Sequence, residues 1–279
     1  MFAPSESRDL GEAVSREAGI ELGALEERAF EQGEFKMRPM LSVRDRSVFV
    51  LQSLAGSAAT GTAQRFVRLL FLLCGLRDAG AQPIGAIAPY LAYARKDRRT
   101  QPRDPVYTRY VAQLLEACGL HQLIALDVHN PAAFDNAFRV RVDHLSALPM
   151  FAEHFARRSD SAELAVASPD VGGIKRAQLF REQLQRRLGR PVELAFVEKR
   201  RAGGQVSVGI VAGNVAGRAV VVLDDLCSSG GTLRRAAASL RGAGATTVHV
   251  AVTHVPLDEG LTAVLADQYV RDVVVTDSV

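Results

Sequence analysis

The segment of residues 219–232, AVVVLDDLCSSGGT, constrains the fold of this chain more than any other stretch. Residues 220–223 form a continuous apolar run, which is typical of a parallel strand covered on both faces. Two acidic residues and a run of small polar residues follow, and residues 233–240 have the pattern of a helix. In open α/β sheets, ligands bind just beyond the carboxyl ends of the strands. The segment therefore predicts an α/β sheet with a ligand site at this strand end.

The polar residues of this segment indicate a sugar phosphate as the ligand. A loop of small residues before a helix can direct backbone N–H groups at a phosphate, and the helix dipole adds attraction. The loop consists of Ser228, Ser229, Gly230, Gly231 and Thr232. Asp224 and Asp225 can accept hydrogen bonds from a vicinal diol. A pentose 5-phosphate therefore matches both the loop, through its phosphate, and the aspartate pair, through its hydroxyls. The alternative interpretation is that the glycines only form a turn between strand and helix.

Length and composition set broad limits on the class of protein. A chain of 279 residues accommodates one large or two ordinary domains, and we expect two. A hydrophobic content of 48% and a charged content of 23% are typical of a soluble globular protein. The 34 Lys and Arg are balanced by 31 Asp and Glu, which gives no reason to expect a nucleic-acid partner.

Cysteine usage and the apolar runs bear on the cellular compartment. The three cysteines lack metal-ligand spacing and suit reduced thiols in the cytosol. The longest apolar run, residues 69–76, is far shorter than the roughly 20 residues of a membrane helix. No basic and apolar leader opens the sequence. We therefore expect a cytoplasmic protein with no membrane partner.

Strand and helix patterns alternate along both halves of the chain, and the boundary is expected near residues 148–151. Strands are predicted at residues 48–52, 84–88, 122–126, 164–167, 192–197 and 246–252, in addition to the first segment. Helices are predicted at residues 62–79, 172–188 and 233–240, and from Pro105 onward with Asp104 as N-cap. Such alternation predicts mostly parallel sheets with helices on both faces.

Two polar segments follow predicted strands of the first half, where loop residues often carry function. Residues 93–99, YARKDRR, contain Arg95, Lys96 and Asp97 and concentrate cations that suit a polyphosphate, although a charge run is often only a solvated loop. His129 follows the strand at residues 122–126. Its imidazole is compatible with contact to a base, with metal binding or with a structural role at the strand end.

Two further polar segments occur in the second half. Residues 168–173, SPDVGG, join a strand to a helix and form a second anion-binding loop, with Asp170 available to a hard cation such as Mg²⁺. Arg176 lies one helical turn further on. Residues 198–204, EKRRAGG, place Lys199 and Arg201 in a segment that either closes over a charged substrate or forms a surface hairpin.

Taken together, these segments resemble the ribose-phosphate pyrophosphokinases, also called phosphoribosyl pyrophosphate synthetases, from about Phe30 onward. The motifs APYLAYARKDRR, ALDVHN, ASPDVGG followed by Arg176, VEKRR and VVLDDLCSSGGT occur in the order of that family. The last motif is shared with all type I phosphoribosyltransferases, and the first four separate the two groups. The resemblance implies two tandem phosphoribosyltransferase-like (type I) domains: an N-terminal ribose-phosphate pyrophosphokinase domain, residues 1–148, and a C-terminal phosphoribosyltransferase-like domain, residues 149–279.

The resemblance also implies an activity and a set of site residues. The activity is transfer of the diphosphoryl group of ATP to the anomeric hydroxyl of ribose 5-phosphate, with release of AMP. The implied catalytic residues are Lys199, Arg201 and His129, and Mg²⁺ would be held near His129 and Asp170. The implied ATP-binding residues are Phe30, Gln32, Glu34, Arg95, Lys96, Asp97 and His129. Ribose 5-phosphate would be bound by Asp224, Asp225, Ser228, Ser229, Gly230, Gly231 and Thr232, and the diphosphate by Asp170, Val171, Gly172, Gly173 and Arg176.

The resemblance further implies a homo-oligomer, a dimer or larger, in which Phe30 and Glu34 of a neighbouring subunit complete the adenine pocket. Gln32 and Lys96 depart from the residues usual in the family near the adenine and ATP, which leaves the nucleotide preference open. Ser228 stands in the ribose phosphate loop where an aspartate is frequent in the family, a change that removes a negative charge from a phosphate-binding loop. Two other functions stay open from the sequence. A phosphoribosyltransferase would keep residues 224–232 but has no evident use for the cations of residues 95–99, and a non-catalytic paralogue would regulate a true synthetase.

Overall fold

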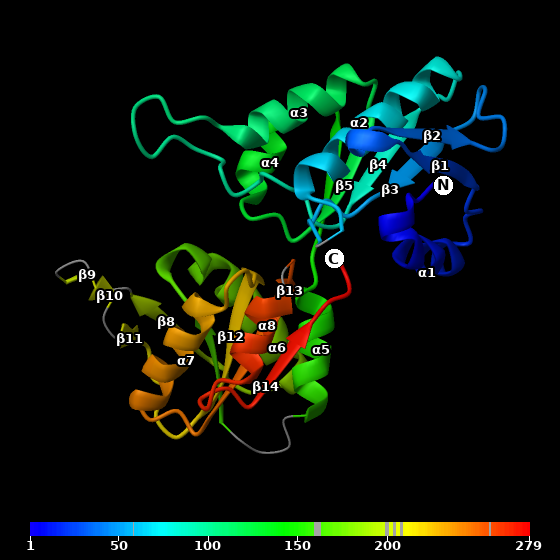
Figure 1. The fold of residues 1–279 in the computed structure, drawn as a ribbon. Helices are drawn as coiled ribbons and strands as arrows, with labels where there is room; N and C mark the ends of the chain where they lie inside the picture. Colours follow the sequence, from blue (N-terminus) through cyan, green and yellow to red (C-terminus); the bar gives the residue numbers. More distant parts are fainter. Residues whose placement is uncertain (58, 159–162, 199–200, 203–204, 207–208, 257) are drawn as a thin grey trace. The chain divides into compact units, whose positions relative to one another are not determined.

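The computed structural model describes residues 1–57, 59–158, 163–198, 201–202, 205–206, 209–256 and 258–279. The chain divides into two compact units (Figure 1). The first comprises residues Met1–Leu145 together with Asp277–Val279, and the second comprises Ser146–Thr276. The last three residues therefore belong to the first unit, whereas the sequence analysis assigned them to the second domain.

The first unit is built on a parallel sheet of four strands in the order β3-β4-β5-β6. The strands are β3 (Val48–Leu51), β4 (Ile84–Ala88), β5 (Gln122–Leu126) and β6 (Arg141–Leu145), and they are connected by α2 (Thr62–Asp78), α3 (Tyr107–Ala117) and α4 (Pro131–Ala137). Leu69, Leu72, Leu73 and Leu76 of α2 follow the helical repeat and are at most 2% exposed. They pack in one apolar cluster with residues of β3 and β4.

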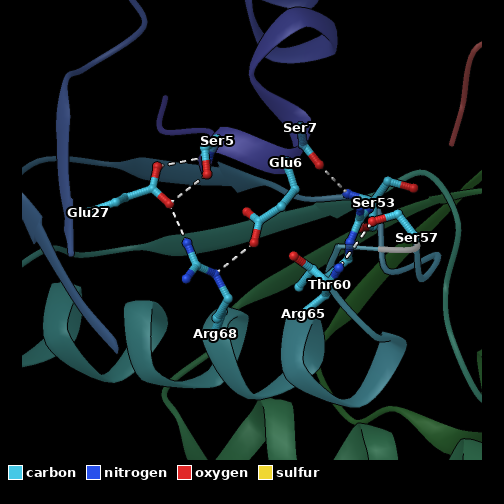
Figure 2. A network of polar contacts seen from close by, with 9 residues as sticks. All are labelled: Ser5, Glu6, Ser7, Glu27, Ser53, Ser57, Thr60, Arg65 and Arg68. Atoms are coloured by element: carbon cyan, nitrogen blue, oxygen red, sulfur yellow. Dashed lines mark hydrogen bonds and ion pairs between the residues drawn. The ribbon is translucent and has the colours of Figure 1, made fainter. Parts of the chain in front are cut away.

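The N-terminal segment adds a short helical turn, a helix and a hairpin to this unit. These are η1 (Ser5–Ser7), α1 (Arg8–Ala18), and the antiparallel strands β1 (Leu25–Ala29) and β2 (Phe35–Pro39), with η2 (Glu31–Gly33) between the strands. Arg68 of α2 fixes the segment (Figure 2): its Nε lies 2.9 Å from Oε1 of Glu6, and its Nη2 contacts Glu27. Since Arg68 is only 8% exposed, its removal would leave two half-buried carboxylates and cost about 3 to 5 kcal/mol.

The second unit contains a six-stranded sheet in the order β11-β8-β7-β12-β13-β14, in which only β11 is antiparallel to its neighbour. Its strands are β7 (Leu164–Ser168), β8 (Glu193–Glu198), β11 (Ile210–Ala212), β12 (Ala219–Leu226), β13 (Thr247–His254) and β14 (Asp272–Val275), and β9 (Arg201–Ala202) pairs with β10 (Gln205–Val206). β12 lies in the middle, and its apolar run at residues 220–223 is at most 1% exposed.

Helices cover both faces of this sheet (Figure 1). They are α5 (Leu148–Arg158), α6 (Ile174–Leu188), which follows η3 (Val171–Gly173), α7 (Gly231–Gly242) and α8 (Asp258–Leu265). From β7 the chain crosses to β8 through α6, and from β12 it crosses in the other direction to β13 through α7. Because such crossovers are right-handed, α6 and α7 lie on opposite faces, and the loops at residues 169–173 and 227–230 meet the same edge of the sheet. The predicted fold class of mostly parallel α/β sheets is confirmed.

One predicted helix start is wrong. Asp104 does not cap the helix that was expected to begin at Pro105, because α3 begins at Tyr107 and Val106 occupies the N-cap position. The Asp104 carboxylate instead accepts hydrogen bonds from the loop that precedes it. In the described part of the chain, no helix has both the length and the apolar character needed to cross a lipid bilayer.

Candidate active site

The two aspartates of the first segment lie in the last third of β12, at the centre of the second sheet. Arg176, from the first turn of α6, reaches them across the strand end, with its Nη1 2.9 Å from Oδ1 of Asp225 and 3.5 Å from Oδ1 of Asp224. The backbone N–H of Asp225 donates to Oδ1 of Asp224 at 3.0 Å. The structure thus brings one residue of the predicted diphosphate site into contact with two residues of the predicted sugar site.

Burial sets the electrostatics of this cluster. The side chain of Asp225 is 7% exposed, that of Arg176 17% and that of Asp224 20%. Burial, and then the negative charge of Asp225, raise the pKa of Asp224 well above its usual value, although the Arg176 guanidinium acts in the opposite direction. Two carboxylates share one cation, so the cluster favours a ligand that donates hydrogen bonds, as sugar hydroxyls do.

The loop of residues 228–232 joins this cluster to the N-terminus of α7. Gly230 is the N-cap residue and has a φ of 71°, in the left-handed region where glycine is favoured. A Cβ built on Gly230 would lie 2.7 Å from the carbonyl oxygen of Gly260 in α8. A Cβ on Gly260 would in turn lie 1.8 Å from the carbonyl oxygen of Ser228. The loop and α8 are therefore in direct backbone contact, which fixes the loop beside the helix dipole of α7.

The second predicted anion-binding loop lies at the end of β7. Oδ1 of Asp170 accepts a hydrogen bond from the backbone N–H of Gly173 at 3.2 Å and so caps η3. The Ser168 hydroxyl donates to the carbonyl oxygen of Asp170 at 2.6 Å. A Cβ on Gly173 would lie 2.5 Å from that hydroxyl oxygen, so the position has room only for glycine. Val171 and Gly172 are exposed on the outside of this turn.

In the first unit, the loops after β4 and β5 lie side by side. The Asn130 side chain donates to Oδ2 of Asp97 at 2.5 Å and accepts from the backbone N–H of Ala133, which makes it the N-cap of α4. Arg95 and His129, one in each loop, are exposed. The structure thus brings the loop that contains Asp97 into contact with the loop that contains His129.

Lys96 is oriented by Asp104 within the same loop. Its Nζ lies 2.6 Å from Oδ2 of Asp104, which also accepts from the hydroxyl of Thr100 at 2.6 Å and from two backbone N–H groups. The hydrogen bond from Lys96 and then those from Thr100 lower the pKa of Asp104. The Asp104 carboxylate therefore orders the loop of residues 96–104 through hydrogen bonds within that loop.

The remaining predicted site residues lie elsewhere. Phe30, Gln32 and Glu34 are exposed at the tip of the β1–β2 hairpin, where the backbone N–H of Phe30 donates to the carbonyl oxygen of Glu34 at 2.8 Å. Lys199 lies outside the described residues. Only the backbone of Arg201 is described, as the first residue of β9.

The described residues contain no group of three or more metal-ligating side chains. The two predicted Mg²⁺ ligands, His129 and Asp170, belong to different units. The predicted metal site therefore stays a prediction.

Sequence reasoning missed two residues that shape the site of the second unit. Arg235 of α7 brings its Nη1 within 3.1 Å of the position that a Cβ on Gly231 would take, and so places a second cation beside the phosphate loop. Its position one turn into the helix, four residues after Gly231, is the signal that could have identified it. Gly260 supports the loop from α8, and no local motif marks that contact.

Comparison with known proteins assigns the class. The profile of the N-terminal domain of ribose phosphate pyrophosphokinase matches residues 1–119, and that of the phosphoribosyl transferase domain matches residues 150–276. The chain is 33% identical to ribose-phosphate pyrophosphokinase 1 of Listeria innocua over 280 residues, covering 100% of this chain and 85% of that protein. It is 32% identical to ribose-phosphate pyrophosphokinase 1 of Streptococcus pneumoniae, covering 100% of this chain and 84% of that protein.

A solved structure agrees with these sequence matches. The phosphoribosylpyrophosphate synthetase of Mycobacterium smegmatis superposes with a TM-score of 0.89 at 31% identity, covering 100% of this chain and 88% of that one. Fold, site and relatives together define a two-unit transferase with the phosphoribosyltransferase fold. The chain belongs to the ribose-phosphate pyrophosphokinase family and is an enzyme of that family.

Proposed function

We propose that this protein transfers the diphosphoryl group of ATP to the anomeric hydroxyl of ribose 5-phosphate, giving 5-phosphoribosyl 1-diphosphate and AMP. The observation that carries the proposal is the contact of Arg176 with Asp224 and Asp225 beside the loop at the N-terminus of α7. Carboxylates for a diol and a helix N-terminus for a phosphate match the two ends of a pentose phosphate. Family membership supports ATP as the second substrate.

Each group of site residues has a separate role in the proposed reaction. Asp224 and Asp225 accept hydrogen bonds from the ribose hydroxyls, and the loop of residues 228–232 binds the 5-phosphate. The diphosphoryl group is bound by the loop of residues 170–173 with Arg176. Lys199 and Arg201 neutralise the charge that develops on the transferred group and on the leaving oxygen. Phosphoryl-type transfer depends mainly on positioning and electrostatics, so no protein nucleophile is needed.

We also propose Mg²⁺ as the cofactor. Asp170 uses Oδ1 to cap η3, and a carboxylate has about four acceptor positions, so the group retains the capacity to bind a hard cation. Mg²⁺ prefers oxygen ligands, which makes Asp170 a better candidate ligand than the imidazole of His129. When bound, the ion neutralises phosphate charge.

We further propose a homo-oligomer, at least a dimer, in which the hairpin tip completes the adenine site of a neighbouring subunit. Phe30 supports this because it is 51% exposed at the end of a two-stranded hairpin, and such a large apolar side chain is more stable when covered by a partner. Glu34 ends the same turn. We propose the cytoplasm as the site of action because the proposed substrates are metabolites of that compartment.

A direct assay tests the reaction. The purified protein is incubated with ATP, Mg²⁺ and ribose 5-phosphate, and AMP and 5-phosphoribosyl 1-diphosphate are quantified. We expect equimolar formation of both. Lys199→Ala serves as the matched variant, and its kcat should fall about 100- to 1000-fold with little change in ribose 5-phosphate binding, because the cation acts mainly in the transition state. If neither product forms under varied metal and phosphate, the protein is not this enzyme.

A further inference from the structure

Arg235 of α7 holds its guanidinium group over the start of its own helix. It is the fifth residue of α7, and helical side chains point toward the helix N-terminus, so the side chain reaches back to Gly231, the first residue. Its Nη1 and Nη2 lie 3.1 and 3.7 Å from the position that a Cβ on Gly231 would take. Among the residues that the structure describes, no carboxylate pairs with this guanidinium.

The preceding residue, Arg234, shows the more usual arrangement on the same helix. Its Nε lies 2.9 Å from Oδ2 of Asp267, whose side chain is 9% exposed. Arg235 has no such counter-ion nearby in the sequence, because neither residues 226–235 nor the first turn of α7 contain an acidic residue. The positive end of the helix dipole repels a cation held at this place. The arrangement becomes favourable when an anion lies between the guanidinium and the helix end.

A hydroxyl of the phosphate loop lies beside the same point. The Ser229 hydroxyl oxygen is 3.7 Å from the Cβ position on Gly231, so this hydroxyl and the guanidinium of Arg235 both lie within 4 Å of one place. Both side chains are exposed and accessible to a ligand. A phosphate group offers three strong acceptor oxygens, and a guanidinium can donate to two of them through parallel N–H groups. A phosphate at this loop can therefore accept hydrogen bonds from Ser229 and Arg235 together.

We propose that Arg235 binds the 5-phosphate of ribose 5-phosphate and makes the site selective for a phosphorylated sugar. The inference rests on the proposed function, which supplies the identity of the ligand. In this arrangement Arg176 serves the hydroxyl end of the sugar, where it contacts Asp224 and Asp225, and Arg235 serves the phosphate end. The 5-phosphate is remote from the anomeric hydroxyl that reacts. Its contact with Arg235 is therefore equally strong in the ground state and in the transition state, so it contributes affinity and not rate.

Titration calorimetry with ribose 5-phosphate on the full chain tests the proposal without requiring catalysis. Arg235→Met removes the guanidinium and keeps an apolar stem, and we expect its Kd to be about tenfold higher because a charge-assisted hydrogen bond is lost. Arg235→Lys keeps a cation that can bind phosphate as a point charge, so its Kd should stay within about threefold of the wild type. Arg234→Met removes the same charge one residue away and should bind the sugar phosphate like the wild type.

Steady-state kinetics and thermal unfolding separate binding from chemistry and from folding. Arg235→Met should raise the KM for ribose 5-phosphate about tenfold and leave kcat and the KM for ATP unchanged. Its melting temperature without ligand should equal or exceed that of the wild type, because a cation beside a helix N-terminus is removed.

Three results would overturn the inference. An unchanged Kd in Arg235→Met would overturn it alone, with the proposed function intact as long as the wild type forms both products. An equal rise of the Kd in Arg234→Met would also overturn it alone, because only the net charge of α7 would then matter. A wild-type protein that does not bind ribose 5-phosphate would overturn both the inference and the proposed function.

Discussion

At the scale of single residues, Asp224 combines a proposed role in sugar binding with a cost to stability. Its raised pKa means that the folded state holds the proton more tightly than the unfolded chain, so the free energy of unfolding falls as pH rises from the usual value of an aspartate through the raised pKa. Asp224→Asn removes this penalty. We expect unchanged or higher stability near neutral pH, with a KM for ribose 5-phosphate raised about tenfold through loss of a charge-assisted hydrogen bond.

Urea unfolding between pH 5 and pH 8 and initial-rate kinetics measure the two effects. Asp135→Asn, an exposed change in α4, serves as the control and should alter neither quantity. A variant at residue 224 that loses stability while its affinity for ribose 5-phosphate stays the same would show that the carboxylate is structural.

Asp104 has a different role at the same scale, because it orders a loop instead of touching a reacting group. Its Oδ2 accepts from Lys96, from the Thr100 hydroxyl and from the backbone N–H groups of Thr100 and Gln101. Asp104→Ala should loosen residues 96–104 and raise the KM for ATP roughly three- to tenfold, with kcat at saturating ATP nearly unchanged, because positioning is lost and chemistry is not. Asp135→Ala is the matched control. An unchanged KM would remove this loop from the ATP site.

Asp104 also shows why its role was not predictable from the sequence. An aspartate followed by proline is a common start of a helix, and local propensity favoured that assignment. The carboxylate instead satisfies four donors of the preceding loop, and this competition depends on the path of the chain between residues 96 and 104. By contrast, the aspartate pair of β12 was predictable because it directly follows an apolar run that is typical of a buried strand.

At the scale of elements, the contact between the phosphate loop and α8 gives a prediction about packing. A methyl group on Gly260 would overlap the carbonyl oxygen of Ser228 at 1.8 Å. Gly260→Ala must therefore shift the loop or α8, at a cost of about 1 to 3 kcal/mol in the free energy of unfolding. Because a displacement of about 1 Å in a positioning element can lower rates about 100-fold, we expect a loss of that order in kcat/KM for ribose 5-phosphate.

Gly242→Ala provides the matched control for this prediction. Gly242 is the last residue of α7, and a Cβ there would meet nothing within 4 Å. The change should stabilise the protein by about 0.5 to 1 kcal/mol and leave the kinetics unchanged. Differential scanning calorimetry and initial rates on both variants decide the matter: a Gly260→Ala enzyme with wild-type kcat/KM would show that the contact with α8 does not position the loop.

The elements that the sequence predicted well share one property, which is a largely apolar run of residues. Residues 84–88 and 122–126 were assigned as strands with the bounds that the structure has, because continuous apolar runs between helices have few alternatives. The β1–β2 hairpin was not predicted. Its strand β1, LEERA, is mostly polar, and both strands contain charged residues that pair across the hairpin, as in the contact of Arg38 with Glu26 at 2.6 Å. Such an element depends on cross-strand pairs that a single strand does not reveal.

At the scale of the whole molecule, the division into two units follows from alternation of strands and helices, but the assignment of the last three residues does not. The Ser53 hydroxyl of the first unit donates to the carbonyl oxygen of Ser278 at 2.7 Å, and Ser278 is 2% exposed. This contact joins residues 225 positions apart, and no local pattern encodes it. The sequence-based prediction assigned the last three residues to the second unit because they follow that unit along the chain.

The proposed oligomer leads to the last prediction, which concerns sites shared between chains. If Phe30 of one subunit completes the ATP site of its neighbour, Phe30→Ala and Lys199→Ala damage the same site from different chains. Random co-assembly of the two variants restores sites in which one chain supplies an intact Phe30 and the other an intact Lys199. With equal amounts, each condition is met half of the time, so the mixture should reach about a quarter of wild-type activity.

Co-expression with two affinity tags and an activity assay of the mixed assemblies measure this recovery. A mixture of Lys199→Ala and Asp224→Asn is the matched control, because both changes affect residues that the proposal takes from the same chain and no hybrid can combine intact copies of them. We expect that control to show only the summed activity of its components. If the Phe30→Ala mixture behaves like the control, the hairpin tip serves its own chain, and its exposed aromatic ring needs another explanation.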